Sequence, residues 1–402
     1  MKKKKDIGLE YINKLGINYE RTIKAIEEKT RNKYGKDKGQ QLINSLCEAN
    51  NKSIDYMEYN RILASQENFA NTWQGSVDAN FVRAACNYIY SNKDQFGDNI
   101  LEVGCGFGFL TCFLSQLFPD KQITSIDIDK SCIKVAKENT ERLGCQNVSF
   151  IVGDVNTISS TFDTIFISRV VHEVAEYNAK FNFNENPFLI MDNVSERLNP
   201  FTDSIIKKLS YDGVIISIDK TYRNPLYLAW LKSLSNSNYF LDIDTHTVIE
   251  VPLSGLPNNA IFMAGVYKRD ISTQDVINTY FSVCSKNLNY SSEHLEGDEA
   301  YLYFWNSKPE LIKGVSAKTQ NTDGMTITVT FLLAFSEINH SYIEYYFYDA
   351  DAKVAILPQE LFTKEEALSQ YNDDYSNFFQ TPNKHHFHDI AELSTLNRMI
   401  FD

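Results

Sequence analysis

A strand-like apolar run that ends in three closely spaced glycines is the feature that most restricts how this chain can fold. Residues 100–111 read ILEVGCGFGFLT, so Gly104, Gly106 and Gly108 occupy alternate positions before a helix-like segment at 109–118. Glycines at such a turn let the backbone approach a ligand without an intervening Cβ, and they permit positive φ angles. A strand, a glycine turn and a helix in this order indicate a nucleotide-binding α/β fold, with the helix N-terminus facing the ligand.

The glycine spacing separates two kinds of nucleotide ligand. A dinucleotide fingerprint has the pattern G-x-G-x-x-G, with the pyrophosphate at the helix N-terminus. Here the third glycine comes one residue early, at Gly108, and Glu102 precedes the loop. A carboxylate at Glu102 would repel a pyrophosphate, whereas it can bind the ammonium group of a sulfonium ligand directly or through water. The spacing therefore counts against a dinucleotide oxidoreductase.

Two further acidic residues follow the next two predicted strands. Asp127, in SIDIDKS, ends the second strand about 20 residues after the glycines, where an acid can accept hydrogen bonds from both hydroxyls of a ribose. Asp154, in FIVGDV, ends the third strand, and its carboxylate can accept a hydrogen bond from an exocyclic adenine amine. Asp129 could instead cap the helix that follows it. Gly108 could instead serve only to let a helix pack closely against a strand.

Strand-like and helix-like segments alternate from residue 100 to about residue 268. The early strand candidates are continuous apolar runs, which is typical of strands buried on both faces of a parallel sheet. The last two candidates, at 240–251 and 259–268, have no clear helix between them, so we expect them to pair as an antiparallel hairpin.

The segments before and after this region differ in character. Residues 1–75 carry apolar residues at helical spacing in a polar background, and 76–91 form a stronger helix with Ser76 as its N-cap. The remainder of the chain, 270–402, is β-rich and aromatic. Four strands are predicted there, at EAYLYFWNS, ELIKGVSAKT, MTITVTFLLAF and YIEYYFYDAD, followed by a helix at TKEEALSQYN.

The pattern E-x-G-x-G-x-G, an acid closing the second strand and G-D-V closing the third resemble the motifs of class I S-adenosylmethionine-dependent methyltransferases. The resemblance covers about residues 76–268. It implies a Rossmann-like α/β fold with a seven-stranded, mostly parallel sheet and S-adenosylmethionine at the carboxyl ends of the first strands. Asp127 would hold the ribose, Asp154 or Val155 the adenine, and Glu102 with Gly104 the methionine end. The cofactor-binding residues predicted in this way are Glu102, Gly104, Cys105, Gly106, Asp127, Ile128, Asp154, Val155 and Ser168.

Candidates for the transfer chemistry lie in SRVVHEV, residues 168–174. Methyl transfer is an in-line displacement, so the enzyme must align the acceptor and in some cases remove its proton. Ser168 begins the loop that leaves the fourth strand, next to the expected methyl group. We predict His172 as a general base, since its unperturbed pKa is about 6.5, and Glu173 as a residue that orients it or binds an amine. The alternative for His172 is packing beneath the loop at a helix start.

Charge and composition restrict the partners. The formal net charge is −13, which disfavours binding to a phosphate backbone. No [DNS]-P-P-[YFW] motif follows the fourth strand, and no Pro-Cys dipeptide occurs anywhere, so we expect no nucleic-acid acceptor. Seven scattered cysteines without a C-x-x-C pair, and no long apolar run, favour a cytoplasmic protein without a membrane span. Three close histidines, His385, His386 and His388, could bind a metal, but we predict no metal site.

Together these observations predict three domains and a function. The domains are an N-terminal helical lid or extension (1–75), an S-adenosylmethionine-binding methyltransferase domain (76–269) and a C-terminal α+β domain (270–402). The predicted function is methylation of a small molecule or peptide on oxygen or nitrogen. The alternative is an S-adenosylmethionine-binding scaffold whose C-terminal domain binds partners. We expect that domain to contact the acceptor, a partner chain or a second copy in a homodimer.

Overall fold

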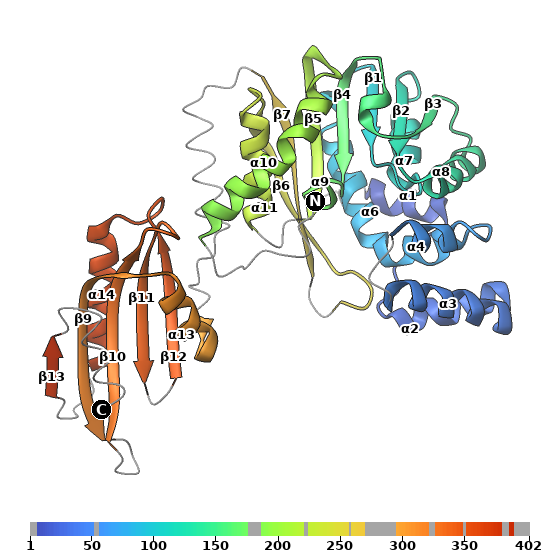
Figure 1. The fold of residues 1–402 in the computed structure, drawn as a ribbon. Coiled ribbons are helices and arrows are strands. Elements are labelled where there is room, and N and C mark those ends of the chain that lie inside the picture. Colours follow the sequence, from blue (N-terminus) through green and yellow to red (C-terminus); the bar gives the residue numbers. More distant parts are fainter. Residues whose placement is uncertain are drawn as a thin grey trace, which may run out of the picture. The chain divides into compact units, whose positions relative to one another are not determined.

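In the computed structural model the chain folds into two compact units (Figure 1). The first unit comprises Met1–Asn178 and Val194–Tyr280, and the second comprises Ala179–Asn193 and Phe281–Asp402. The residues that the structure describes are 6–51, 56–175, 186–220, 224–256, 259–269, 295–320, 326–348, 351–379 and 386–389.

A seven-stranded sheet with the strand order β3-β2-β1-β4-β5-β7-β6 forms the centre of the first unit. Its first five strands in the chain are parallel, and β7 runs antiparallel to both β5 and β6. The predicted seven-stranded sheet and its closing hairpin are therefore confirmed. The strands are β1 Asn99–Val103, β2 Gln122–Asp127, β3 Val148–Val152, β4 Phe162–Ser168, β5 Leu209–Lys220, β6 Phe240–Val251 and β7 Ala260–Lys268.

Helices or helical turns connect the five parallel strands of this sheet, which places the carboxyl ends of these strands along one edge, and α6 precedes the first strand. One of them corrects a predicted cap: α6 begins at Gln74 rather than after Ser76, and the Ser76 hydroxyl donates to the carbonyl of Thr72 at 2.8 Å. Ser76 is buried inside the first turns, where a serine bonds back to the preceding turn instead of capping it. The helices are α6 Gln74–Ser91, α7 Phe109–Leu117, α8 Lys130–Leu143, α9 Val171–Val174, α10 Pro187–Ile206 and α11 Asn224–Ser235, with 3₁₀ turns η1 Lys93–Gln95 and η2 Val155–Thr157.

The N-terminal helices share one hydrophobic core with the sheet. Tyr11, Leu15 and Phe69 from the first 75 residues belong to the same buried cluster as Phe113 on α7 and Phe262 on β7. The Tyr11 hydroxyl also donates to the carbonyl of Phe109 at the start of α7. The predicted helical character of this segment is confirmed by α1 Ile7–Leu15, α2 Ile23–Tyr34, α3 Lys36–Asn51, α4 Tyr56–Leu63 and α5 Phe69–Thr72, drawn in blue in Figure 1.

A six-stranded antiparallel sheet with the order β13-β9-β10-β11-β12-β8 forms the second unit, drawn in orange and red (Figure 1). This agrees with the predicted β-rich character, the three strands predicted after residue 309 and the helix predicted after them. The elements are β8 Leu295–Glu296, α13 Gly297–Asn306, β9 Glu310–Gln320, β10 Thr326–Ser336, β11 Ser341–Tyr348, β12 Asp351–Pro358, α14 Lys364–Phe379 and β13 His386–Asp389.

The strand predicted at EAYLYFWNS is wrong, because this segment is helix α13. Aromatic residues favour strands in general, but Ala300 and Phe304 are four residues apart and both fully buried, which is a helical spacing. The Phe304 ring stacks on Tyr345 of β11 with centroids 4.4 Å apart, so the helix covers one face of the sheet.

Candidate functional site

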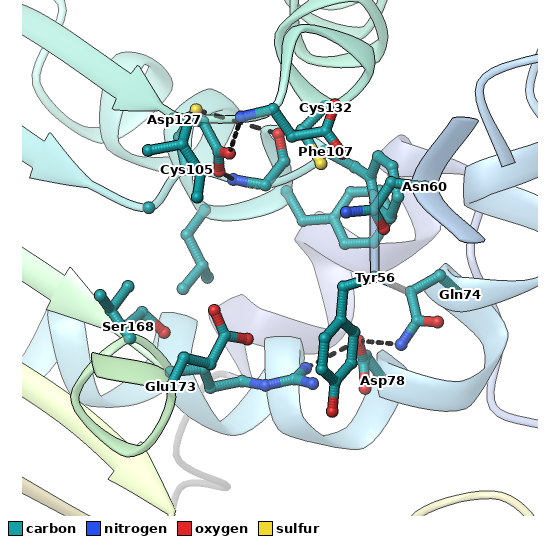
Figure 2. A pocket seen from close by; sticks show the side chains of 18 of the residues that line it. Tyr56, Asn60, Gln74, Asp78, Cys105, Phe107, Asp127, Cys132, Ser168 and Glu173 are labelled. Atoms are coloured by element: carbon teal, nitrogen blue, oxygen red, sulfur yellow. Dashed lines mark hydrogen bonds and ion pairs between the residues drawn. The ribbon is translucent and has the colours of Figure 1, made fainter. Parts of the chain in front are cut away.

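A cavity of about 300 Å³ lies in the first unit, at the carboxyl ends of β1, β2 and β4 (Figure 2). One wall is formed by the glycine loop after β1 and by the end of β2. The opposite wall is formed by the segment that leaves β4, and helices α4 and α6 contribute further side chains. Ligands of open α/β sheets bind at this edge of the sheet.

The glycine loop presents bare backbone to this cavity. Gly104, Gly106 and Gly108 have φ angles of 73°, 52° and 77°, which side-chain-bearing residues rarely adopt. A Cβ on Gly104 would lie 2.2 Å from Val170, whereas a Cβ on Gly106 would meet no atom within 4 Å. Gly106 therefore borders open space that a ligand can occupy.

The Asp127 carboxylate fastens this loop to the end of β2. Its Oδ2 accepts a hydrogen bond from the amide of Gly106 at 2.8 Å, and its Oδ1 accepts one from the amide of Asp129 at 2.9 Å. Burial raises the pKa of Asp127. Asp129 caps α8 by accepting from the amide of Ser131 at 2.7 Å, as the capping alternative predicted, and it also lines the cavity. Ile128 lines the cavity between them.

Glu102 is a buried carboxyl at the back of the cavity. It is 2% exposed, and its Oε2 accepts hydrogen bonds from the hydroxyls of Thr111 at 2.5 Å and Ser125 at 2.7 Å. Burial raises the pKa of Glu102 to about 7, because desolvation outweighs the two hydroxyl donors. The side chain is therefore poised to ionise when a cation reaches it.

The segment after β4 brings Ser168, Arg169 and Glu173 to the opposite wall. Arg169 has a φ angle of 61°, and its amide donates to the carbonyl of Ile218 at 2.9 Å. Its guanidinium forms an ion pair with Asp78 of α6 at 2.7 Å and lies over the Phe81 ring, 5.3 Å from its centre. A side chain held in strained backbone at a cavity wall is a common property of functional sites.

Glu173 and His172 point to different places although they are adjacent on α9. The Glu173 carboxyl faces the interior of the cavity (Figure 2). The residue is exposed, and the desolvation that raises its pKa is counteracted by the neighbouring His172 and Arg169. His172 is not among the residues that line the cavity. Its Nδ1 lies 2.8 Å from the Asp219 carboxylate, whose other oxygen accepts from the amide of Val171 at 2.8 Å. His172 and Asp219 thus hold the start of α9, and a role for His172 as general base stays a prediction.

The structure brings most of the predicted cofactor residues together, but not the two assigned to adenine. Asp154 is exposed and caps η2 by accepting from the amide of Asn156 at 2.8 Å, while Val155 is buried, and neither lines the cavity. The predicted residues that do line it are Glu102, Gly104, Cys105, Gly106, Asp127, Ile128, Ser168 and Glu173.

Sequence reasoning missed the contribution of the N-terminal helices. The Tyr59 hydroxyl donates to Gln74 at 3.2 Å, Gln74 donates to Asp78 at 2.8 Å, and Asp78 pairs with Arg169. This chain of polar contacts links α4, α6 and the exit of β4 along the cavity. An available signal was the i, i+4 spacing of Gln74 and Asp78 on a helix face that also carries Phe81 and buries against the core.

Two further predictions concern metals and membranes. Within the described residues, no group of three or more His, Cys, Asp or Glu side chains could hold a metal ion. His385 and the side chains of His386 and His388 lie outside what the structure describes. No helix in the described part of the chain has the length and apolar character needed to cross a bilayer.

Comparison with known proteins finds a methyltransferase domain in part of this chain. Residues 94–250 match a family model described as a methyltransferase domain. A malonyl-[acyl-carrier protein] O-methyltransferase of Bacillus anthracis is 33% identical over 29% of this chain and 41% of its own length. A protein-L-isoaspartate O-methyltransferase of Thermotoga maritima is 34% identical over 20% of this chain and 26% of its own. Among solved structures, precorrin-6y C5,15-methyltransferase from Geobacter metallireducens aligns with a TM-score of 0.34 and 13% identity, over 47% of this chain and 89% of that one.

The strand order, the glycine loop and the family match together define a methyltransferase domain. Residues 94–250 form a methyltransferase domain, and the predicted resemblance to class I S-adenosylmethionine-dependent methyltransferases, with its cofactor, is confirmed for this part of the chain. The chain spans less than half the length of either curated relative named above.

Proposed function

We propose that this chain transfers the methyl group of S-adenosylmethionine to a small-molecule or peptide acceptor. The observation that carries this proposal is a cavity with two different walls (Figure 2). One wall holds the glycine loop and the Glu102 and Asp127 carboxyls, and the other holds Ser168 and Glu173. An acceptor that enters between them would meet the methyl group along a defined direction, which is the main requirement of an in-line displacement.

The residues of the first wall fit the cofactor. Gly106 leaves open space where a Cβ would lie, so that backbone can approach the ligand. Glu102 is a buried carboxyl with a raised pKa that would gain a partner in the ammonium group of the methionine end. Asp127 stands at the end of β2 with a carboxylate that can accept from ribose hydroxyls. When bound, the cofactor supplies an electrophilic methyl group on a sulfonium.

The choice of acceptor class rests on charge. The net charge of −13 and the carboxyls of the cavity oppose the approach of a phosphate backbone, so we propose that nucleic acid is not the acceptor. Incubation of the full chain with radiolabelled S-adenosylmethionine and separate pools of metabolites, peptides, DNA and RNA is expected to label the first or second pool. Efficient, salt-sensitive labelling of DNA or RNA would contradict the proposal.

We also propose that the second unit contacts the acceptor, a partner chain or a second copy in a homodimer, and that it does not bind the cofactor. We further propose that the protein is cytoplasmic. All described residues that line the cavity belong to the first unit. An experiment that truncates the chain at the predicted boundary after residue 269 must take Asn186 into account. Asn186 belongs to the second unit, where its amide donates to the carbonyls of Asn339 and His340 at 2.8 and 3.1 Å, so a chain truncated after Arg269 leaves it without these partners.

Replacing Asp127 with Asn is expected to weaken the binding of S-adenosylhomocysteine by about 1–2 kcal/mol. The amide keeps one acceptor but cannot accept from the Gly106 amide, the Asp129 amide and the ribose hydroxyls together. Titration calorimetry measures the change. Asp120→Asn, in the exposed turn before β2, is the matched control and should bind as the wild type does. Equal affinity of both variants would remove Asp127 from the site.

A further inference from the structure

The glycine loop does not keep a single shape by itself. Its three glycines have φ angles between 52° and 77°, and glycine adopts negative φ angles just as readily. Strand β2 holds the first half of the loop. The amides of Gly104 and Cys105 donate to the carbonyl of Ile126 at 2.9 and 3.1 Å, and the amide of Gly106 donates to Asp127. These contacts do not hold the half of the loop that leads into α7.

A buried pair of asparagines holds that second half. Asn139 of α8 donates from Nδ2 to the carbonyl of Phe107 at 3.0 Å. Asn139 also pairs reciprocally with Asn71 of α5, with N–O distances of 2.9 and 3.2 Å. The two side chains are 2% and 3% exposed, and hydrogen bonds are stronger in such surroundings than in water. Phe107 lines the cavity (Figure 2), whereas the asparagines do not, so they can act on a ligand only through the loop.

The end of α1 fixes the direction of this pair. The carbonyl of Leu15 accepts from Asn71 Nδ2 at 3.4 Å and from the Arg142 guanidinium at 3.0 Å, and Arg142 also donates to Asn139 Oδ1 at 2.9 Å. A guanidinium can only donate, so it requires the oxygen of the Asn139 amide on its side. The Asn139 nitrogen is thereby directed at the Phe107 carbonyl, which can only accept.

A second N-terminal side chain holds the residue after the loop. The hydroxyl of Tyr11 on α1 donates to the carbonyl of Phe109, which is the first residue of α7 and also lines the cavity. Tyr11 is buried, and its ring packs edge-on against Phe113 with centroids 5.0 Å apart. Side chains connected to α1 and α5 therefore hold the backbone on both sides of Gly108.

We propose that Asn71, Asn139 and Tyr11 are positioning residues for S-adenosylmethionine, and that α1 and α5 control cofactor affinity by holding the glycine loop in its binding conformation. This inference rests on the cofactor wall of the proposed function and does not depend on the acceptor. It gives residues 1–75, predicted as a lid or extension, a role in the cofactor site itself.

The expected effect on affinity follows from populations. A loop that is released at Phe107 or Phe109 samples further backbone conformations, and the cofactor binds only the competent fraction. The apparent Kd rises by the inverse of that fraction, so a loop that is competent for a tenth of the time binds about tenfold more weakly. A residue that stabilises the fold alone would leave the Kd of the folded molecules unchanged.

Calorimetry of the full chain with S-adenosylhomocysteine tests the pair. Asn139→Ala removes the donor to Phe107 and should weaken binding about tenfold, whereas Asn71→Ala leaves that donor in place and should weaken binding about threefold. Because both residues act through one hydrogen bond, the double variant should bind no more weakly than Asn139→Ala. The binding stoichiometry should stay that of the wild type, which shows that the variants are folded.

Two further measurements do not rely on the asparagine variants binding ligand. Tyr11→Phe keeps the ring and removes only the hydroxyl that binds Phe109, so it should weaken binding about threefold without unfolding the chain. Hydrogen exchange followed by mass spectrometry reports the loop directly. Without ligand, the peptide 104–110 should exchange faster in Asn71→Ala and Tyr11→Phe than in the wild type, and saturating S-adenosylhomocysteine should restore its protection. A purely structural role would raise exchange only around the substituted helix.

Controls separate this inference from the proposed function. Asn44→Ala, an exposed asparagine on α3, and Glu141→Gln, an exposed glutamate on α8 outside the cavity, should match the wild type in every measurement. Failure of the wild type to bind S-adenosylhomocysteine would overturn the proposed cofactor wall. Wild-type affinity in folded Asn139→Ala, or additive losses in the double variant, would overturn the positioning role alone. If the asparagine variants do not fold, Tyr11→Phe decides, and unchanged affinity and exchange there would overturn it equally.

Discussion

Replacing Glu102 with Gln is expected to remove a pH dependence of about 3 kcal/mol from the stability of the cofactor-free protein. The pKa of Glu102 is raised by burial to about 7, against 4.5 for an ordinary glutamate. Since each pKa unit corresponds to about 1.4 kcal/mol, ionising this group inside the folded protein is unfavourable by about 3 kcal/mol. Glutamine keeps the shape and a hydrogen-bonding group but cannot ionise.

The sign of the effect follows from proton linkage. A folded-state pKa above the unfolded one means that the folded protein binds the proton more tightly. The stabilisation from protonated Glu102 is therefore complete below pH 4.5 and is lost as the pH rises to about 7. Urea unfolding of both proteins across this range should show the wild type losing about 3 kcal/mol relative to Glu102→Gln. Parallel curves would contradict the raised pKa.

The same group should couple cofactor binding to proton release. If the ammonium of the methionine end pairs with ionised Glu102, binding must remove the proton that Glu102 carries below pH 7. Calorimetry of S-adenosylhomocysteine in buffers with different ionisation enthalpies should then show release of about one proton near pH 6 from the wild type. Glu102→Gln should release none and bind more weakly, while Glu141→Gln serves as the control. Equal release from both proteins would place the ammonium elsewhere.

Local sequence patterns predicted the cofactor wall because its parts are close in the chain. The glycines, the preceding Glu102 and the acid ending β2 lie within 26 residues of each other by number, from Glu102 to Asp127. A strand, a loop and a helix in succession also determine where each of these residues points. The confirmed sheet order follows for a similar reason, since alternating strands and helices allow few arrangements.

Residues brought in from distant segments were not predictable in the same way. Asp78 and Tyr56 reach the cavity because the N-terminal helices share the core of the sheet, which depends on the packing of many apolar side chains. The contrast between His172 and Glu173 has the same origin. His172 and Glu173 were both candidate catalytic residues because of their chemistry. Asp219, 47 residues after His172 in the chain, binds the His172 ring and holds it outside the cavity lining. The strand predicted in place of α13 was wrong because aromatic composition outweighed the helical spacing of two buried residues.

Replacing Gly108 with Ala is expected to destabilise the protein by about 3 kcal/mol, combining backbone strain with overpacking. Its φ angle is 77°, and an added Cβ would lie 2.8 Å from both Cα and Cβ of Ala136 on α8. Helix α8 cannot yield locally, because the obstacle includes its backbone. Chemical denaturation measures the loss. Gly144→Ala is the matched control, since Gly144 has a φ angle of 70° but no atom within 4 Å of an added Cβ. It should lose only about 1 kcal/mol.

Replacing Gly106 with Ala is expected to weaken ligand binding strongly, with only a small loss of stability. Its φ angle of 52° implies a loss of stability similar to that of Gly144→Ala, about 1 kcal/mol. An added Cβ would meet no protein atom, but it would enter the space that the cofactor is proposed to fill. Affinity for S-adenosylhomocysteine should therefore fall more than tenfold in Gly106→Ala, because the added methyl group displaces the ligand from the loop. It should stay unchanged in Gly144→Ala. The three variants then distinguish three effects at similar φ angles: Gly108→Ala reports helix packing, Gly106→Ala reports the approach of the ligand, and Gly144→Ala reports backbone strain alone. Wild-type affinity in Gly106→Ala would show that the ligand does not approach the loop at this point.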